Sequence, residues 1–383
     1  MAKLSLDDHL HLTSVCRHYH RAKSFNLSSP LPSSPWLILP GRSSTTLKFL
    51  PQAKTTPYEA ITPSPFIRRR LFIGSSNGWV VTVSCNPSLD LHLLNPLTGT
   101  QHPLPPIHTL PFITPIPNKP NSSSVHYRIT NYKTFDHHSF IHYFFTKAVI
   151  STKDFTVLLA HPNHNNATLS YTHPDRSKWV SFVIPGHYHD AVDVIHDKGL
   201  FYAITSVGDI IICGPSSTTR VLSFQDPQFM DVEDPSSTRY IVRSVHGDLL
   251  LVHRRIEISA DKDYNELLKF KTRKFMVYRI DGHKNNDQRY WKRVNDLGEQ
   301  CLFLGTNESM AFSALKYPEL QRNCIYFTES RTQNKSVRCR QPKQCDLGVF
   351  NLSDKSIKPL FYPSDLTWPP PIWFTPHIEG SHQ

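Results

Sequence analysis

The stretch that decides the fold is AVDVIHDKGLFYAITSVGDIIICG, residues 191–214. It contains three short apolar runs rich in β-branched and aromatic residues, which favour strands over helices. Two turn signals, DKG at 197–199 and GD at 208–209, separate the runs at intervals of about nine residues. Spacing of this kind is typical of consecutive antiparallel strands joined by tight turns. We therefore predict a three-stranded antiparallel meander here.

Similar runs extend from this meander toward both ends of the chain. No segment alternates strands with long helices, which a parallel α/β sheet requires. The charged segment 254–273 is predicted to be a protruding hairpin or loop, and residues 102–124, rich in Pro, Asn and Ser, a long surface loop. Further predicted strand regions are 36–40, 71–73, 79–83, 89–94, 144–150, 156–160, 179–184, 249–252, 275–278, 325–327, 347–350 and 357–361.

Composition excludes several classes of protein. The 383 residues include 31 Pro but only 14 Gly, with 22 Phe and 15 Tyr, which fits short strands and tight loops better than a helix bundle. No apolar run approaches the roughly 18 residues that a membrane helix needs, so we expect no membrane association. A protein with many antiparallel strands must avoid exposed strand edges, and a sandwich, a barrel and a propeller each do so. These three architectures remain open as alternatives. Residues 35–376 would fit up to about seven propeller blades of roughly 45 residues each.

Charge and cysteine usage bear on partners and compartment. The 42 Lys and Arg residues outnumber the 31 Asp and Glu residues, which gives a formal net charge of +11. The densest basic segment, 331–343, contains no aromatic side chain that could stack on a base, so we interpret it as a solvated loop and expect no specific nucleic-acid partner. Seven scattered cysteines predict a reduced protein of the cytoplasm, the nucleus or both. The basic run at 68–70 is too short to select the nucleus.

Residues 5–24 carry the clearest helix signal. Ser5 and Asp8 have the spacing of a capping box in which Asp replaces Glu or Gln. The Ser- and Pro-rich residues 28–35 cannot continue a helix, so they mark a boundary. From the residues alone, the apolar stripe of this helix is equally compatible with docking a partner and with packing on the rest of the protein. That stripe comprises Leu10, Leu12, Val15, Cys16, Tyr19 and Ala22.

The motif GSSNG at 74–78 satisfies the G-x-S-x-G pattern of a serine nucleophile elbow. That elbow places the serine on a sharp turn leading into a helix, where backbone N–H groups hold the oxyanion. Here the β-branched run WVVTV follows at 79–83. The sequence therefore favours a tight hairpin turn at Ser76 over a catalytic serine.

Histidines and acids cluster in two places along the chain. Zinc needs three or four ligands in tetrahedral geometry, and strand alternation sends Asp190 and Asp193 to opposite faces. With 22 histidines, chance clusters are common, so structural or surface roles are favoured. Cys339 and Cys345 lack the paired spacing of a zinc knuckle. The two clusters are His187, His189, Asp190, Asp193 and His196, and His137, His138 and His142.

Tryptophans stand at the start of several predicted strands. They could line a ligand-binding face, but an aromatic residue in this position more often packs between sheets. We therefore assign them to the core, and we identify no catalytic, cofactor-binding or metal-binding residue in the chain. The tryptophans concerned are Trp79, Trp179, Trp291 and Trp373.

Seven short motifs follow one another in a recognisable order: GSSNGW at 74–79, LLNPLTG at 93–99, GLFYA at 199–203, GDLL at 247–250, LFLGTN at 302–307, NCIYFT at 323–328 and PPPIWFTP at 369–376. Together they resemble those of a large plant family in which an N-terminal F-box precedes a KIB-type β-propeller. The resemblance implies an all-β fold, with a β-propeller of short four-stranded antiparallel blades at 35–377 and a tail at 378–383. It implies no cofactor.

The N-terminal helix resembles the second half of an F-box. LSLDDHL at 4–10 and VCR at 15–17 match, whereas the family has Trp and Arg where this chain has Tyr19 and His20. The opening Leu-Pro and first helix of the F-box, which supply much of the surface that docks the Skp adaptor, have no counterpart. A shortened gene model and real loss of the module are both open. The resemblance implies a partial helical F-box at 1–25, a linker at 26–34, and the adaptor-facing side chains Leu6, Leu10, Leu12, Val15 and Tyr19.

The resemblance also implies a function. It predicts a non-catalytic substrate-recognition subunit of an SCF (Skp–cullin–F-box) ubiquitin ligase, which binds a Skp-type adaptor and an unidentified target protein. Loops on a rigid scaffold carry binding specificity, so the segments expected to contact the target are 102–124, 254–273 and 331–343. One alternative is a propeller scaffold that has lost adaptor binding and acts outside ubiquitination. Another is a serine hydrolase that uses Ser76.

Overall fold

The computed structural model describes most of residues 34–376. Outside the described residues lie the predicted linker apart from Ser34, the basic segment 331–343, the tail, and the adaptor-facing side chains Leu6, Leu10, Leu12, Val15 and Tyr19. Within 34–376, the undescribed residues are 42, 44, 53–56, 62–68, 118–124, 152, 185–188, 225–236, 261–267, 283–288, 330–345 and 361–368.

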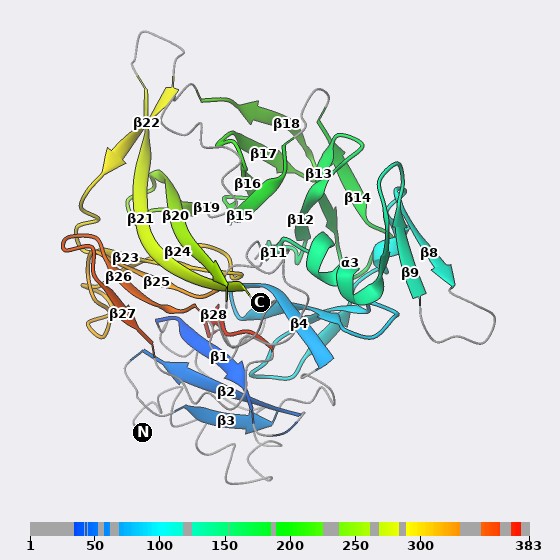
Figure 1. Ribbon diagram of the computed structural model, residues 1–383, viewed down its shortest axis with the longest axis horizontal. Coiled ribbons are helices and arrows are strands. Elements are labelled where there is room, and N and C mark those ends of the chain that lie inside the picture. Colours follow the sequence, from blue (N-terminus) through cyan, green and yellow to red (C-terminus); the bar gives the residue numbers. More distant parts are fainter. Residues whose placement is uncertain are drawn as a thin grey trace.

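Six small sheets of the described chain surround a common axis as the blades of a propeller (Figure 1). Named from the innermost strand outward, blade 1 contains β28 (Ile372–Phe374), β1 (Trp36–Pro40), β2 (Thr46–Pro51) and β3 (Tyr58–Ile61). Blade 2 contains β4 (Arg70–Ser76), β5 (Trp79–Ser84), β6 (Leu91–Leu94) and β7 (Gln101–Pro103). Blade 3 contains β11 (Lys147–Ile150), β12 (Val157–His164), β13 (Ala167–Thr172) and β14 (Val180–Val183).

The remaining three blades follow the same order around the axis. Blade 4 contains β15 (Ala191–Asp197), β16 (Leu200–Thr205), β17 (Ile210–Gly214) and β18 (Ser217–Leu222). Blade 5 contains β19 (Ser237–Arg243), β20 (Leu249–Ala260), β21 (Leu268–Gly282) and β22 (Arg289–Val294). Blade 6 contains β24 (Met310–Ser313), β23 (Gln300–Leu304), β25 (Cys324–Phe327), β26 (Gly348–Asn351) and β27 (Ile357–Pro359).

The ring closes because the last strand pairs with the first. β28 lies antiparallel to β1, with Trp36 opposite Phe374. The innermost strands contact one another in the order β28, β4, β11, β15, β19 and β24. Thr375, just after β28, donates a hydrogen bond to Met310 of β24 and so completes the circuit. A closed ring of this kind hides the inner strand edges that an open sheet would expose.

Blade 4 confirms the meander predicted at residues 191–214. β15, β16 and β17 are consecutive antiparallel neighbours, with Asp197 opposite Leu200 at the first turn. Lys198 and Gly199 in that turn have φ values of 50° and 81°. Positive φ at both central residues is the geometry of a type I′ turn, whose twist matches that of the flanking strands. The prediction of short four-stranded antiparallel blades holds for blades 1 to 5.

Blade 6 differs, because its hairpin folds back toward the axis. β24 pairs antiparallel with β23 on the axial side, whereas β25 pairs parallel with β23 on the other side. The chain must therefore leave β24 and cross to the outer side of β23 before it forms β25. Residues 305–309, which link β23 to β24, consequently lie at the centre of the ring.

The prediction of a surface loop at 102–124 is wrong for the residues described there. This segment supplies β7, the 3-10 helix η2 (Ile107–Thr109) and β8 (Ile113–Pro117). Leu104, Ile107 and Phe112 are buried in the cluster that joins blades 2 and 3. The apolar residues between the prolines carry the segment into the core, since proline is tolerated in edge strands and loops.

An inserted unit between blades 2 and 3 contains a helix that the sequence did not predict. β8, β9 (Val125–Ile129) and β10 (Thr134–Asp136) form a small sheet, and α3 (His137–Phe144) follows. Asp136 caps α3 by accepting a hydrogen bond of 3.0 Å from the backbone N–H of Ser139. Buried side chains in the helix are Phe140, Ile141 and Phe144. No helix of the described chain has both the length and the apolarity to cross a bilayer.

Apolar side chains fill the spaces between neighbouring blades. One cluster joins blades 5 and 6, and another joins blades 1 and 6. The core assignment of the tryptophans is confirmed, because all four are at most 5% exposed. These are Trp79, Trp179, Trp291 and Trp373.

The charged segment 254–273 was predicted to be a hairpin or a loop, and its described residues belong to the hairpin of β20 and β21. β20 and β21 pair from Leu250 opposite Arg279 to Ala260 opposite Leu268, with a register shift after Arg255. Figure 1 shows the two strands running from β22 toward the centre of the view. Blade 5 is therefore the blade with the longest strands in the described part of the chain.

Candidate functional site

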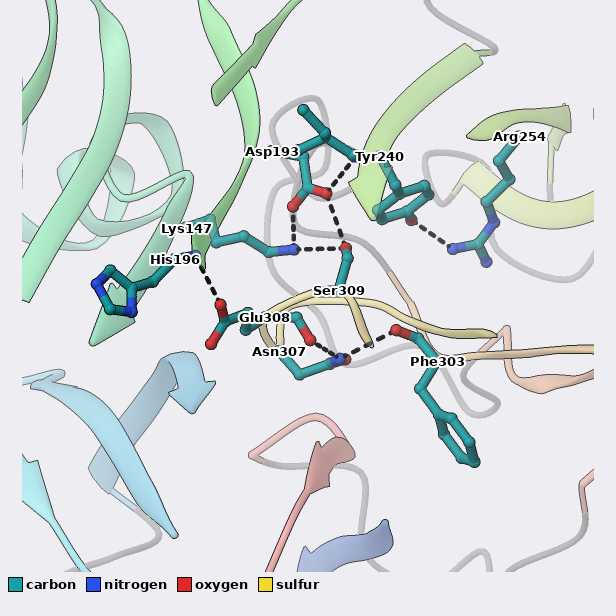
Figure 2. A network of polar contacts seen from close by, with 10 residues as sticks. Lys147, Asp193, His196, Tyr240, Arg254, Phe303, Asn307, Glu308 and Ser309 are labelled. Carbon is teal, nitrogen blue, oxygen red and sulfur yellow. Dashed lines mark hydrogen bonds and ion pairs between the residues drawn. The ribbon is translucent and has the colours of Figure 1, made fainter. Parts of the chain in front are cut away.

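Residues 305–309 bring a polar loop to the centre of the ring, where Figure 2 shows its contacts. The loop can pass close to β25 because residue 305 is glycine. A Cβ atom at Gly305 would lie 2.0 Å from the hydroxyl oxygen of Thr328, a distance that no side chain could adopt. Asn307 holds the turn from within, since its amide nitrogen donates to the carbonyl oxygens of Phe303 at 3.3 Å and Glu308 at 2.6 Å.

Asp193 is the acceptor at the centre of this polar network. Its carboxylate accepts a hydrogen bond of 2.7 Å from the Ser309 hydroxyl and one of 2.8 Å from the Ile241 backbone N–H. The ammonium group of Lys147 forms an ion pair with the same carboxylate. Asp193 is 0% exposed and Lys147 3%. Burial raises the pKa of Asp193, and the hydrogen bonds and the charge of Lys147 oppose that shift.

Glu308 extends the network to the neighbouring blades. Its Oε1 accepts a hydrogen bond of 2.7 Å from the backbone N–H of His196 on β15. Its own backbone N–H donates to the carbonyl oxygen of Ser75 on β4 at 2.9 Å. The Ser75 hydroxyl in turn donates to the carbonyl oxygen of Trp373 on β28. Burial raises the pKa of Glu308 to about 7.

The arrangement fastens the blades rather than exposing reactive groups. Its contacts reach the innermost strand or the adjoining loop of all six blades within the described chain. Lys147 lies 3.5 Å from the Ser309 hydroxyl, but that hydroxyl donates its proton to Asp193. Because Ser309 donates to a carboxylate and Lys147 donates toward Ser309, the hydroxyl-to-amine hydrogen bond of a Ser–Lys dyad is not formed. This geometry supports a structural role.

Ser76 lies in the tight hairpin turn that the sequence favoured. Ser76 is opposite Trp79 in the register of β4 and β5, and Asn77 and Gly78 between them have φ values of 46° and 87°. The Ser76 hydroxyl is buried and accepts a hydrogen bond of 3.2 Å from the Ile150 N–H. A strand continues after the turn, so the strand-to-helix geometry of a nucleophile elbow is not formed.

The residues weighed as metal ligands are used in other contacts. Asp190 accepts a hydrogen bond of 2.7 Å from the Asn163 N–H, and Asp193 belongs to the axial network. The His196 ring packs 5.0 Å from that of Phe201. Among the described residues, no three His, Cys, Asp or Glu side chains come together as metal ligands. His187, Cys339 and Cys345 lie outside the described residues.

The second cluster of histidines lies on α3. His137 and His138 start the helix with their rings 4.1 Å apart, and His142 lies in its last turn. Burial and the neighbouring charge of His138 lower the pKa of His137. These three histidines therefore belong to the inserted unit between blades 2 and 3.

A second buried network ties the β20–β21 hairpin to blade 6. Arg254 donates hydrogen bonds to the Thr272 hydroxyl at 2.8 Å, the Tyr240 hydroxyl at 3.0 Å and the Thr328 carbonyl oxygen at 2.7 Å. It also pairs with Asp346 at 3.0 Å, directly after the undescribed residues 330–345. Arg254 therefore joins the β20–β21 hairpin to blade 6 through Thr328 and Asp346.

Arg254 belongs to the charged segment 254–273 that was predicted to protrude, but its side chain is buried. The side chain is 0% exposed, and its guanidinium lies 5.7 Å from the ring centre of Phe275 and 4.9 Å from that of Phe327. Burial acts to lower its pKa, but Tyr240 and Asp346 outweigh burial and raise it. Leu250, Val252 and Ile256 are apolar and lie at even spacing from residue 254, so they share its face of β20, and this was the signal that could have placed it inside.

Comparison with known proteins adds family information to this geometry. The chain is 26% identical over 221 residues to the F-box protein SKIP23 of Arabidopsis thaliana, covering 54% of this chain and 50% of that protein. It is also 26% identical over 178 residues to an F-box/kelch-repeat protein of Arabidopsis thaliana, covering 46% of this chain and 41% of that protein. The chain thus spans half or less of the length of these two relatives.

Two solved structures show only distant similarity. A virginiamycin B lyase from Staphylococcus aureus matches with a TM-score of 0.30 and 13% identity, covering 64% of this chain and 86% of that chain. YCF48 bound to a D1 peptide matches with a TM-score of 0.28 and 9% identity, covering 67% of this chain and 76% of that chain. Similarity this low supports no functional comparison.

The family described as KIB1-4 beta-propeller matches residues 49–351. That range runs from β2 to the end of β26 and includes the loop at 305–309, Asp193 and Arg254. Most of the chain lies within the match. The chain therefore belongs to the KIB1-4 beta-propeller family.

Proposed function

We propose that this chain is a non-catalytic substrate-recognition subunit of an SCF ubiquitin ligase, and that its propeller binds the target protein. Such a subunit accelerates ubiquitin transfer by holding the target near the conjugating enzyme, which raises the effective concentration. We further propose that it acts in the cytoplasm, the nucleus or both. The names of the two F-box relatives support the link to Skp-type adaptors.

One structural observation carries the proposal. The polar groups at the axis are joined to one another, while the charged β20–β21 hairpin presents exposed side chains from a rigid closed ring. Arg255, Lys271 and Lys274 are exposed on this hairpin, and the buried Arg254 fixes its base. A rigid scaffold with an anchored, charged projection suits binding of another protein better than chemistry.

The alternative function is a propeller scaffold that works without the adaptor. The family match supports it, because that match covers residues 49–351 of the propeller and none of the predicted F-box residues. Both functions share target binding by the propeller, so they differ only in adaptor binding and in the fate of the target.

Adaptor binding by the full chain separates the two functions. The chain and a plant Skp-type adaptor would be mixed and analysed by size-exclusion chromatography. Co-elution that is lost when Leu10 and Val15 are changed to Asp would support the SCF subunit. The matched control is Lys153→Asp on blade 3, far from the N-terminal helix in sequence. No co-elution of the unmodified chain would contradict the proposal and leave the scaffold.

A further inference from the structure

Three basic side chains from two blades form a cluster at the junction of blades 5 and 6. Lys274 lies on β21, Arg293 on β22 and Lys355 in the turn between β26 and β27, and all three are exposed. Figure 1 shows β22 of blade 5 and the β26–β27 end of blade 6 on the same side of the ring. We name Lys274, Arg293 and Lys355 the junction cluster.

The three charges act on one another. Burial, then Arg293, then Lys274 lower the pKa of Lys355. Asp354 opposes the shift, but each of the two cations outweighs it. Phe275, Val294 and Ile357 each lie within two residues of one of the cations and pack in one apolar cluster between blades 5 and 6, so the cations are gathered at the same junction. Like charges gathered in this way repel each other, and a bound anion relieves that cost.

Several other basic residues of blade 5 form ion pairs with acids. Lys292 lies 3.6 Å from Asp281, and Arg273 pairs with Glu257. Within the described chain, no such ion pair is formed by a member of the junction cluster. The positive charge of the cluster is thus not neutralised by an ion pair within the described chain.

Two members of the cluster are held in position before any partner binds. Arg293 packs its guanidinium 6.0 Å from the centre of the Tyr278 ring and donates a hydrogen bond of 3.3 Å to Asn295. Lys355 donates a hydrogen bond to the Leu352 carbonyl oxygen. Side chains that are already ordered lose less entropy when they bind, so this arrangement favours recognition over a purely solvating role.

We propose that the junction cluster is a docking surface for an acidic, Asp- and Glu-rich segment of the target protein. This inference rests on the proposed function for the identity of the partner as a target. Carboxylates complement the three cations, and guanidinium and ammonium groups bind them through charge-assisted hydrogen bonds. Nucleic acid fits less well, because binding of bases uses exposed aromatic rings and Tyr278 beside the cluster is only 7% exposed.

Fluorescence anisotropy with the full chain tests the surface without the adaptor. The probe is a fluorescein-labelled Glu-rich peptide, and the comparison probes are a Gln-substituted peptide of equal length and a single-stranded oligonucleotide of equal charge. The test variant combines Lys274→Glu, Arg293→Glu and Lys355→Glu. The control variant combines Lys153→Glu, Lys178→Glu and Arg220→Glu on blades 3 and 4, which makes the same change in net charge on exposed positions.

The expected result is a loss of affinity for the Glu-rich peptide of about tenfold or more in the test variant, against about twofold or less in the control. The Gln-substituted peptide should bind weakly to every protein, and added salt should weaken binding of the Glu-rich peptide. Equal losses of affinity for the Glu-rich peptide in both variants would show that binding depends on net charge and not on the junction cluster, which would overturn the inference. Unchanged affinity in the test variant, or tighter binding of the oligonucleotide than of the peptide, would also overturn the inference.

Failure of the peptide-binding test can be told apart from failure of the proposed function, because the two tests probe different parts of the chain. Adaptor co-elution depends on the N-terminal helix, whereas peptide binding depends on blades 5 and 6. A chain that binds the Glu-rich peptide through the cluster but not the adaptor would retain the docking surface and lose the SCF assignment. Unfolding curves of both variants should match that of the unmodified chain, because all six substitutions are on exposed side chains.

Discussion

The Ser309 hydroxyl donates a hydrogen bond of 2.7 Å to Asp193 although the two residues lie 116 positions apart in the chain. Asp193 belongs to the innermost strand of blade 4, and Ser309 to the loop of blade 6 that reaches the axis. The contact passes across blade 5, whose Ile241 N–H donates to the same carboxylate. A polar bond at the axis therefore links blades that are not neighbours in the ring.

Removing the carboxylate at this position should strongly destabilise the propeller. Asp193→Ala leaves the ammonium group of Lys147 buried without its partner, which typically costs about 3–5 kcal/mol. We expect a loss of that order in the free energy of unfolding, measured with denaturant. Asp175→Ala is the control, since this side chain is 90% exposed and should change stability by about 0.5 kcal/mol or less. A loss in Asp193→Ala no larger than in the control would contradict the role of the axial network.

Glu308 should make stability depend on pH. Its pKa is about 7 in the folded protein and 4.5 as the ordinary value. Between these pH values the folded protein keeps a proton on Glu308 that the unfolded chain has released. The extra proton stabilises the folded state at low pH, and this contribution to the free energy of unfolding is lost as pH rises through about 4.5 to 7. In Glu308→Gln the side chain stays neutral. The free energy of unfolding of this variant, relative to the unmodified protein, should therefore rise by up to about 3 kcal/mol between about pH 5 and pH 8.

Other titrating groups change the free energy of unfolding with pH in the opposite direction. The quantity to compare is therefore the difference in this free energy between Glu308→Gln and the unmodified chain. Burial lowers the pKa of His92 and His164, so protonation of the unfolded chain reduces stability as pH falls below the ordinary histidine value. That contribution is present in both proteins and cancels. A difference between Glu308→Gln and the unmodified chain that stays constant with pH would exclude titration of Glu308 in this range.

Arg254 should control the stability of the hairpin base. Arg254→Lys keeps the charge but loses the planar fork that reaches Thr272, Tyr240 and Asp346 together, so the substitution is not conservative. We expect a loss of about 2–4 kcal/mol in the free energy of unfolding and faster amide hydrogen exchange in β20 and β21. Arg273→Lys is the matched control, because Arg273 lies on the same hairpin and is 56% exposed. Equal amide exchange rates of β20 and β21 in the two variants would contradict the stabilising role of Arg254 at the hairpin.

Ring closure should depend on Trp373. This side chain is 0% exposed and packs edge-on against Phe303 of blade 6 at 5.0 Å. Trp373→Ala would leave a large cavity between blades 1 and 6, for which a loss of about 3–5 kcal/mol is typical. Leu315→Ala, at a residue 77% exposed, should have little effect on the unfolding midpoint. Similar midpoints for the two variants would show that β28 does not close the ring.

The strands were readable from the sequence because short apolar runs and turn residues act locally. The turn at Lys198 and Gly199 is an example, since its positive φ values follow from residues at the turn itself. The helix α3 also had local signals, the cap Asp136 and the spacing of Phe140 and Phe144, although of its residues only Phe144 lay in a predicted strand, 144–150.

The axial network could not be derived in the same way. Asp193 was weighed only as a metal ligand, because its real partners, Lys147 and Ser309, are distant in sequence. A buried carboxylate on an apolar strand indicates that some partner exists, but the partner is fixed by how the blades close around the axis. The register of β20 could have placed Arg254 inside, whereas its pairing with Asp346 depends on the fold of blade 6.

The most direct measurement follows the ubiquitination of proteins that bind the propeller. Proteins bound by the unmodified chain in plant cells, but not by the variant with Lys274→Glu, Arg293→Glu and Lys355→Glu, would be quantified with and without the chain present. A substrate receptor predicts that at least one of them loses ubiquitin and accumulates when the chain is depleted. Unchanged ubiquitination and abundance of every such protein would contradict the assignment to a ubiquitin ligase.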